Sequence, residues 1–113
     1  MGNNINIELV VSSKTIHLNE VNQYNVGLKI LNTNSQKAKF NISKTELWVN
    51  GEKNIAWDLA VQNGTLVNLV IPASASEKIM WKLGDALFPK AGNYKLDLRW
   101  KDTSQIKEVI VSD

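Results

Sequence analysis

The stretch that decides the fold is residues 94–101, Tyr-Lys-Leu-Asp-Leu-Arg-Trp-Lys, in which large apolar side chains alternate strictly with charged ones. Successive side chains of a β-strand point to opposite faces of a sheet, so a period of two predicts one buried and one solvated face. The same alternation occurs near residues 5–11 and 24–30. Such patterns indicate half-buried antiparallel strands.

Seven further candidate strands fill most of the remaining chain, each rich in Val, Ile, Leu, Thr or Trp. They lie near residues 15–19, 37–43, 45–49, 54–61, 65–71, 77–83 and 105–112. Clusters of Asn, Ser, Gly and Pro separate them, as expected for turns. The nearest thing to a helix is residues 81–88, where we expect a short helical turn that Pro89 ends.

Short candidate strands at this regular spacing predict an all-β fold, in which we expect about 7–9 strands to form. We expect an immunoglobulin-like, two-sheet antiparallel sandwich that occupies residues 1–113 as a single domain. A closed barrel is the competing architecture. The sandwich is favoured because the alternation is one-sided, and because residues 91–94, Ala-Gly-Asn-Tyr, open a strand as a tyrosine corner does. In that device the tyrosine hydroxyl, here that of Tyr94, bonds to backbone a few residues upstream.

The composition excludes several classes of protein. The chain has 113 residues, no Cys and one His, which removes disulfide scaffolds, zinc fingers, iron–sulfur sites and cysteine-based catalysis. Its net charge is +2, with both signs interspersed, so we expect no nucleic-acid partner. No apolar run approaches the roughly 18 residues of a membrane helix, so no membrane insertion is expected. The compartment, and whether Met1-Gly2 is an expression leader, stay open.

The four tryptophans fall into two groups, according to whether the residues two positions away, which would point to the same face of a strand, are apolar. Three of them share a face with apolar residues and are predicted to lie in the core: Trp57 with Ile55, Leu59 and Val61, Trp81 with Ile79 and Leu83, and Trp100 with Leu96 and Leu98. Burying a ring of this size contributes several kcal/mol, about 3–5 by truncation to Ala.

Trp48 is the exception, because the apolar residues next to it, Leu47 and Val49, would point to the opposite face of the strand, and only one of the two faces can lie against the core. If the hairpin through Asn50-Gly51 has an even loop, Trp48 shares the face of Trp57; if the loop is odd, Trp48 lies outside. The odd loop gives the more amphipathic strands, so we predict an exposed or edge Trp48. It is the candidate partner-binding residue, since Trp is enriched at interface hot spots. The alternative is that it packs on a lysine stem or covers the sheet edge.

No catalytic, cofactor-binding or metal-binding residues are predicted, and we expect the protein not to be an enzyme. His17 lies between Ile16 and Leu18 with outward parity, which indicates an ordinary surface histidine. The carboxylates, among them Asp97 and Glu46, are expected to be isolated on solvated faces. The glycines are scattered and form no phosphate-binding loop.

A series of features between Val26 and Trp100 resembles a known family. An alternating strand runs into an Asn-containing turn at 26–35, a short turn precedes an apolar residue and Trp at 50–57, a strand ends in a Pro-containing turn at 69–77, and a Pro-x-x-Gly-x-Tyr opening spans 89–94. This order is similar to that of the bacterial intracellular proteinase inhibitor family, whose members have an immunoglobulin-like sandwich. The turn at 72–77 is longer than the family's and lacks its glycine, and no inhibitory residue matches.

Two functions are consistent with these features. The first is a non-enzymatic protein-interaction module, whose partner the resemblance implies to be a proteinase. The alternative is a carbohydrate-binding or adhesion sandwich of the cell envelope, in which Trp48 with Tyr24 or Phe88 stacks on sugar rings. A homo-oligomer paired through edge strands also stays open, because sandwich edges can add strands from a partner.

Overall fold

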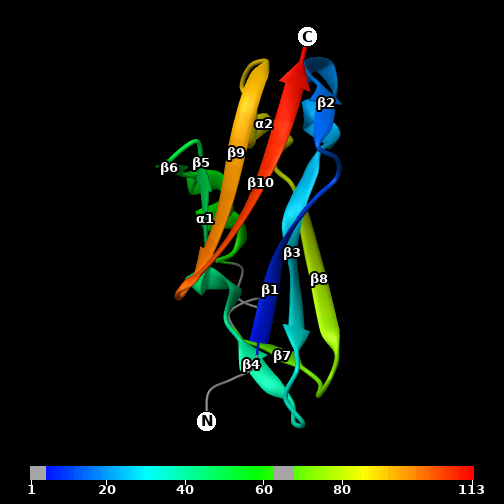
Figure 1. Ribbon diagram of the computed structural model, residues 1–113, viewed down its shortest axis with the longest axis vertical. Coiled ribbons are helices and arrows are strands. Elements are labelled where there is room, and N and C mark those ends of the chain that lie inside the picture. Colours follow the sequence, from blue (N-terminus) through cyan, green and yellow to red (C-terminus); the bar gives the residue numbers. More distant parts are fainter. Residues whose placement is uncertain (1–4, 63–67) are drawn as a thin grey trace.

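The computed structural model describes residues 5–62 and 68–113, whose strands form two main sheets and one small one (Figure 1). The three-stranded sheet has the order β1-β3-β8, with β1 Ile5–Val11, β3 Asn25–Asn32 and β8 Ser76–Lys82. The five-stranded sheet has the order β2-β10-β9-β5-β6, with β2 Thr15–His17, β10 Thr103–Ser112, β9 Gly92–Trp100, β5 Glu46–Val49 and β6 Glu52–Lys53. The small sheet pairs β4 Ala38–Phe40 with β7 Leu69–Ile71.

The helices of the described residues are short. They are the 3-10 helices η1 Leu18–Gln23 and η2 Ile42–Lys44 and the α-helices α1 Ile55–Ala60 and α2 Gly84–Leu87. Helix α2 is the predicted helical turn before Pro89. None of the described helices has the length and apolarity needed to cross a bilayer.

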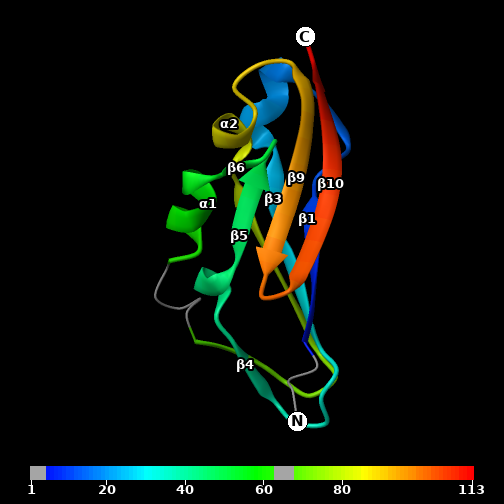
Figure 2. The ribbon, with the colours of Figure 1, turned by 60° about the vertical axis from the view of Figure 1, so that its left-hand side comes forward.

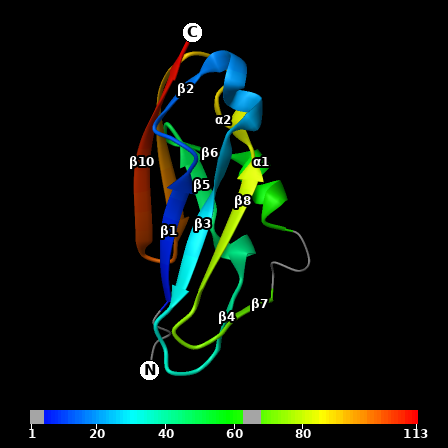
Figure 3. The ribbon, with the colours of Figure 1, turned by 90° about the vertical axis from the view of Figure 1, so that its right-hand side faces the viewer.

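The two main sheets pack face to face and enclose one hydrophobic core (Figure 3). The inward positions that the alternation predicted are buried: Ile5, Ile7 and Leu9 on β1, Val26, Leu28 and Ile30 on β3, and Leu96 and Leu98 on β9. Pairing is antiparallel except between β2 and β10, which run parallel. The predicted immunoglobulin-like sandwich is therefore confirmed, and the barrel is excluded because the two sheets are separate.

The predicted tyrosine corner is present. The Tyr94 hydroxyl donates a hydrogen bond to the Lys90 carbonyl oxygen at 2.6 Å. Its ring contacts Phe88 edge to face at 4.9 Å between centroids, and Phe88 in turn contacts Tyr24 at 5.2 Å. These three rings close the end of the core next to α2, and such pairs add about 0.5–1.5 kcal/mol each beyond the area they bury.

The strand predicted over residues 54–61 is wrong, because this segment forms helix α1. The Asn54 side chain caps it by accepting the backbone N–H of Trp57 at 2.9 Å. Trp57 is buried as predicted, and its indole N–H donates to Thr45 Oγ1 at 3.1 Å. Ile55 and Leu59, predicted to share its face, are instead 70% and 71% exposed. Helical geometry turns residues i−2 and i+2 away from residue i, whereas a strand aligns them.

Several other predicted elements differ in extent. Segment 15–19 is strand only through His17 and then continues as η1, and segment 37–43 is strand only to Phe40 before η2 begins. Of segment 65–71, residues 65–67 lie outside the described residues and Leu69–Ile71 is β7. Trp81 and Trp100 are only partly buried and pack against the margin of the core.

The hairpin between β5 and β6 has a two-residue turn, so the predicted odd loop is wrong. Val49 pairs with Glu52, and the turn residues Asn50 and Gly51 have φ values of 51° and 85°. This left-handed pair is the geometry that Asn-Gly favours, because it matches the twist of the flanking strands. Trp48 still lies on the outer side, because β5 also pairs with β9, where the buried Leu47 is opposite the buried Leu98 and Trp48 is opposite Asp97 on the other face.

Candidate interaction surfaces

The outer face of the five-stranded sheet carries Trp48 and takes part in the three ion pairs of the described residues. Strand register places two rows of side chains there, Lys53, Trp48, Asp97 and Ile106 in one row and Glu46, Arg99 and Ser104 in the next. We call these seven residues, together with Ile110 on β10, the Trp48 face. Figure 2 looks onto this side of the molecule, where β5, β9 and β10 lie in front.

Trp48 is partly exposed and is held by two side chains. Its indole N–H donates to Glu46 Oε1 at 3.0 Å, and the guanidinium carbon of Arg99 lies 4.4 Å from the ring centroid. A cation at this distance over an indole is attracted by its quadrupole, by about 0.5–1 kcal/mol at exposed sites. The ring is therefore fixed against the sheet, as the packing alternative anticipated, although its partner is an arginine. Its role in binding stays a prediction.

The expectation of isolated carboxylates is wrong for Asp97 and Glu46, which both have partners on this face. Asp97 is only 9% exposed, accepts the Ser104 hydroxyl at 2.5 Å and pairs with Arg99 Nε at 2.8 Å. Desolvation alone would raise the pKa of Asp97, but the hydrogen bonds from Ser104 and Arg99 and the charge of Arg99 outweigh it and lower that pKa below its usual value.

Glu46 is held in the same way at the margin of the face. The hydrogen bond from Trp48 is the main cause that lowers the pKa of Glu46, and the nearby charge of Lys53 adds to it. Lys53 Nζ lies 3.5 Å from both Glu46 and Asp58 and so links β6 to α1. Such exposed ion pairs add little stability, at most about 1 kcal/mol each, but they restrict the side chains around Trp48.

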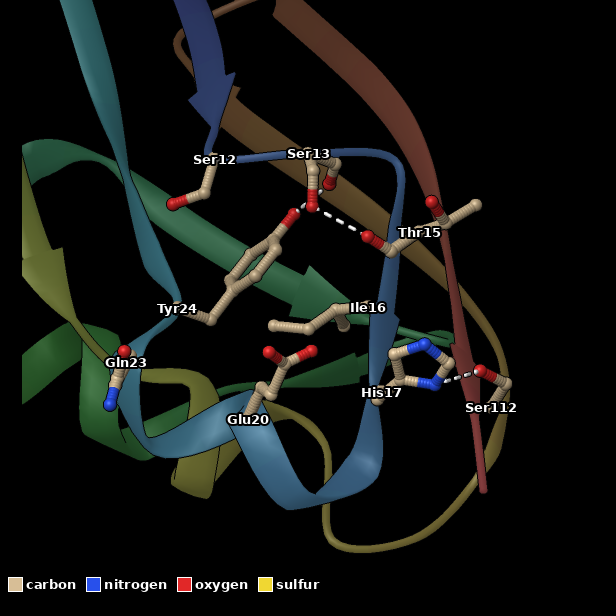
Figure 4. Close-up of a pocket in the computed structure, with 9 residues that line it drawn as sticks. All are labelled: Ser12, Ser13, Thr15, Ile16, His17, Glu20, Gln23, Tyr24 and Ser112. Atoms are coloured by element: carbon tan, nitrogen blue, oxygen red, sulfur yellow. Dashed lines mark hydrogen bonds between the residues drawn. The ribbon is translucent and has the colours of Figure 1, made fainter.

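A second feature is a polar pocket of about 380 Å³ beside β2 and η1 (Figure 4). His17 and Glu20 line it, and the Tyr24 ring forms its inner wall. The Tyr24 hydroxyl donates to the Ser13 carbonyl oxygen. Burial raises the pKa of the Tyr24 hydroxyl, with the Ser13 bond opposing that shift. Ser13, Tyr24 and His17, which line the pocket, are thus all engaged in hydrogen bonds within the protein.

His17 is exposed, as its parity predicted, and its ring Nδ1 lies 3.1 Å from the Ser112 hydroxyl. The sequence pattern does not predict that Ser112 contacts His17, because the two residues are 95 positions apart. The parallel pairing of β2 with β10 brings them together. A serine beside an imidazole is the start of a nucleophile–base pair, but such pairs need a third group that orients the base. Within the described residues, no carboxylate is hydrogen-bonded to His17 and no group of three or more His, Asp and Glu could hold a metal ion.

The sugar-stacking alternative loses two of its three rings. Tyr24 and Phe88 are each 1% exposed and contact each other within the core. Tyr24 follows η1 and Phe88 follows α2, so neither ring lies within a strand whose alternation would predict its burial. Trp48 is left without a second ring to form a platform.

Comparison with known proteins gives similarity of structure only. No family model and no curated protein matches the sequence. The CARDB domain of a Pyrococcus furiosus protein, solved in complex with di-metal ions, matches with a TM-score of 0.56 and 10% identity over 97% of this chain and 94% of that one. The β-glucosidases of Erythrobacter marinus and Listeria innocua match with TM-scores of 0.58 and 0.55 and identities of 8% and 12%, over 96% and 97% of this chain.

The extent of these matches limits what they transfer. This chain spans 15% and 16% of the two β-glucosidase chains, so it is similar to one part of each. At identities of 8% to 12% the likeness concerns the fold alone. The chain has an immunoglobulin-like β-sandwich fold, similar to a CARDB domain and to a portion of these β-glucosidases.

Proposed function

We propose that this chain is a non-enzymatic protein-interaction module that binds its partner through the Trp48 face. One observation carries the proposal: Trp48 stands on the solvent side of a sheet, fixed by Glu46 and stacked against Arg99. Interface hot spots are enriched in Trp, Tyr and Arg. A tryptophan and an arginine held together on an uncovered sheet face are therefore a suitable anchor for another protein.

The surroundings of Trp48 support a protein partner. Ile106 and Ile110 on β10 are 51% and 50% exposed on the same face. Single exposed apolar residues are ordinary, but three large side chains on one sheet face offer a partner apolar area within a polar rim. Side chains already held by hydrogen bonds also lose less conformational entropy when a partner binds.

The buried polar groups are consistent with a role that is not enzymatic. Asn32, Thr45 and Asp97 are the buried polar residues of the described chain, and each is engaged in hydrogen bonds that tie elements together. His17 is the one imidazole of the sequence. If a hydrolytic activity is detected in the purified protein, its loss in the double variant His17→Ala with Ser112→Ala would argue against the proposal, and its survival would exclude this pair as its source but leave carboxylate chemistry open.

The partner class can be tested directly. The family resemblance implies a proteinase, so purified protein is titrated into a panel of serine proteinases at micromolar concentration. Inhibition of at least one enzyme, abolished by Trp48→Ala, is the result expected of an inhibitor that uses this face. Full activity of every enzyme would remove the inhibitor form and leave a general interaction role.

The surface is tested with the partner obtained by affinity capture from the native source and then purified. We expect Trp48→Ala, and separately Ile106→Asp, to weaken the measured Kd at least tenfold, since hot-spot truncations cost about 2 kcal/mol or more. Val70→Ala serves as the matched control, because Val70 is an exposed apolar residue on β7 away from this face. Unchanged binding by both face variants, with unchanged melting temperature, would place the interaction elsewhere.

A further inference from the structure

Strand β8 is an open edge of the sandwich. Its seven residues pair with β3 on one side, and no described strand pairs with it on the other. The strand is held against the core, because Trp81 on its inner face contacts Trp57 of α1 at 5.1 Å between ring centroids. An edge of this length presents unpaired backbone N–H and C=O groups that an extended segment can bond.

The other sheet edges are less suited to adding a strand. Strand β1, the opposite edge of the same sheet, lies against β10 of the second sheet. The outer strands of the five-stranded sheet, β2 and β6, have only three and two residues. Strand β2 leaves residues 103–109 of β10 unpaired on that side, but β10 is the strand against which β1 lies. Among the described strands, β8 is therefore the long regular edge (Figure 3).

Lysines dominate the outer face of the sheet at this edge. Lys78 and Lys82 of β8 are exposed on that face, with the partly buried Met80 midway between them. Lys29 of β3 is directly opposite Lys78, although like charges facing each other across strands are destabilising. Within the described residues, none of the three lysines has a carboxylate within 4.0 Å; Glu8, the acid facing Lys29 from β1, lies on the side away from the edge.

We propose that β8 accepts an extended acidic segment of a partner protein as an added strand. Main-chain hydrogen bonds to the free edge would supply affinity, and side chains alternating along the segment would supply specificity. The spacing on β8 specifies the segment: two acidic residues four positions apart to face Lys78 and Lys82, and an apolar residue midway to pack on Met80. This edge is separate from the Trp48 face, so the proposal stands or falls independently of the proposed function.

The same charges argue against a second copy of the chain as the occupant. A two-fold axis that joined two β8 strands would bring two copies of Lys78 and two of Lys82 onto one continuous sheet face, with Lys29 behind each. Lysine on an edge strand is a known protection against such self-pairing. It repels a like strand and attracts an acidic one.

The test uses a fluorescently labelled seven-residue peptide, Thr-Glu-Thr-Val-Thr-Glu-Thr, blocked at both ends. Its pattern reads the same in both directions, so it fits β8 in either strand orientation. Binding is measured by anisotropy in about 25 mM salt, where surface charges are weakly screened. We expect saturable binding to the whole chain, roughly tenfold weaker for Lys78→Glu with Lys82→Glu. Lys95→Glu, with Lys95 exposed on β9 of the other sheet, is the matched control and should bind like the wild type.

Two further measurements decide whether the peptide adds a strand. Amide hydrogen exchange of residues 76–82 should slow at saturating peptide, and a peptide with Lys in place of both Glu should bind the doubly reversed variant but not the wild type. Absence of wild-type binding at 1 mM peptide, equal binding by the reversed variant, or unchanged exchange in β8 would each overturn the proposal. So would a dimer of the chain alone that Lys78→Glu disrupts.

Discussion

At the scale of single residues, the buried polar side-chain atoms of the described residues all have hydrogen-bond partners. Asn32 is fully buried, and its side-chain nitrogen donates to the carbonyl oxygens of Gln36 and Ile71 at 3.0 Å each. Its oxygen accepts from the backbone N–H of Asn34. One amide thus joins the end of β3 to the end of β7. Hydrogen bonds of this kind contribute modestly while they are intact, but a buried partner left unpaired is costly.

The contact of Thr45 with Trp57 gives a first prediction. Thr45 Oγ1 accepts the Trp57 indole N–H at 3.1 Å and donates to the Ile42 carbonyl oxygen at 2.7 Å. Thr45→Val keeps the shape but leaves a buried N–H without an acceptor, so the free energy of unfolding should fall by about 1–3 kcal/mol. Urea denaturation checks this value. Thr15→Val, at an exposed position of β2, should change it by less than about 0.5 kcal/mol; equal losses would contradict the assignment.

Asp97 gives a second prediction, on pH dependence. Its pKa in the folded protein is lowered, so its contribution to stability is fully present above the unfolded pKa of about 3.9 and is lost as pH falls through the lower folded value. Between pH 5 and pH 2, stability should therefore fall less steeply in Asp97→Asn than in the wild type. Unfolding free energies measured across that range check the slope. Asp102→Asn, at an exposed turn, should keep the wild-type slope; an unchanged slope in Asp97→Asn would refute the prediction.

At the scale of elements, the close approach of β3 and β8 depends on Gly27. A Cβ atom at this position would lie 1.8 Å from the Ile79 carbonyl oxygen, far inside van der Waals contact. Gly27 is opposite Met80 in the register, so the strand that carries the proposed edge is positioned by a residue without a side chain. Glycine in a strand commonly marks such an approach of two backbones.

Gly27→Ala should therefore destabilise the protein strongly, by about 3 kcal/mol or more, because the clash is with backbone and cannot be relieved by a rotamer change. Chemical denaturation gives the value, and amide exchange should quicken first in β8. Gly51→Ala is an informative comparison: nothing lies within 4 Å of a Cβ there, but its φ of 85° costs an Ala about 1–2 kcal/mol. A smaller loss in Gly27→Ala than in Gly51→Ala would show that β8 can shift.

Helix α1 shows how an element can be misassigned while its central residue is assigned correctly. Residues 54–61 have apolar side chains at Ile55, Trp57, Leu59 and Val61, the spacing of a strand, but only Trp57 and Val61, which are about one helical turn apart, are buried. The signals for a helix were the capping Asn54 and the absence of β-branched residues in the helix after Ile55. They are weak over six residues, since isolated helices this short are not stable and tertiary packing decides their conformation.

At the scale of the whole molecule, both main sheets contribute to one hydrophobic core. The molecule is elongated, with principal extents of 47 × 24 × 22 Å, and the strands run along its long direction (Figure 1). The two surfaces proposed for binding belong to different sheets, the Trp48 face to the five-stranded sheet and the β8 edge to the three-stranded one. The chain could therefore engage two partners at once without competition between them.

A shared core predicts a single cooperative transition on unfolding. Tryptophan fluorescence of a variant with Trp48→Phe and Trp100→Phe, which then reports on Trp57 and Trp81 beside α1, and far-ultraviolet circular dichroism, which reports on the sheets, should give the same urea midpoint. Two separated midpoints would mean that the region around α1, β4 and β7 unfolds independently of the sandwich.

The sequence by itself determined the class of the fold, the inward faces of the long strands and the tyrosine corner at Tyr94, because these depend on local periodicity and on turn residues close in the chain. The tertiary structure decided where Trp48 lies and what surrounds it. Arg99, Asp97 and Ser104 reach Trp48 through the pairing of β5, β9 and β10, and that register joins residues about 50 positions apart. The same holds for the lysines of β8, which become an exposed edge only because β8 pairs with β3 alone. Local pattern fixes which side of a strand is buried; which strands become neighbours depends on closing long loops around a common core, and no single segment encodes that.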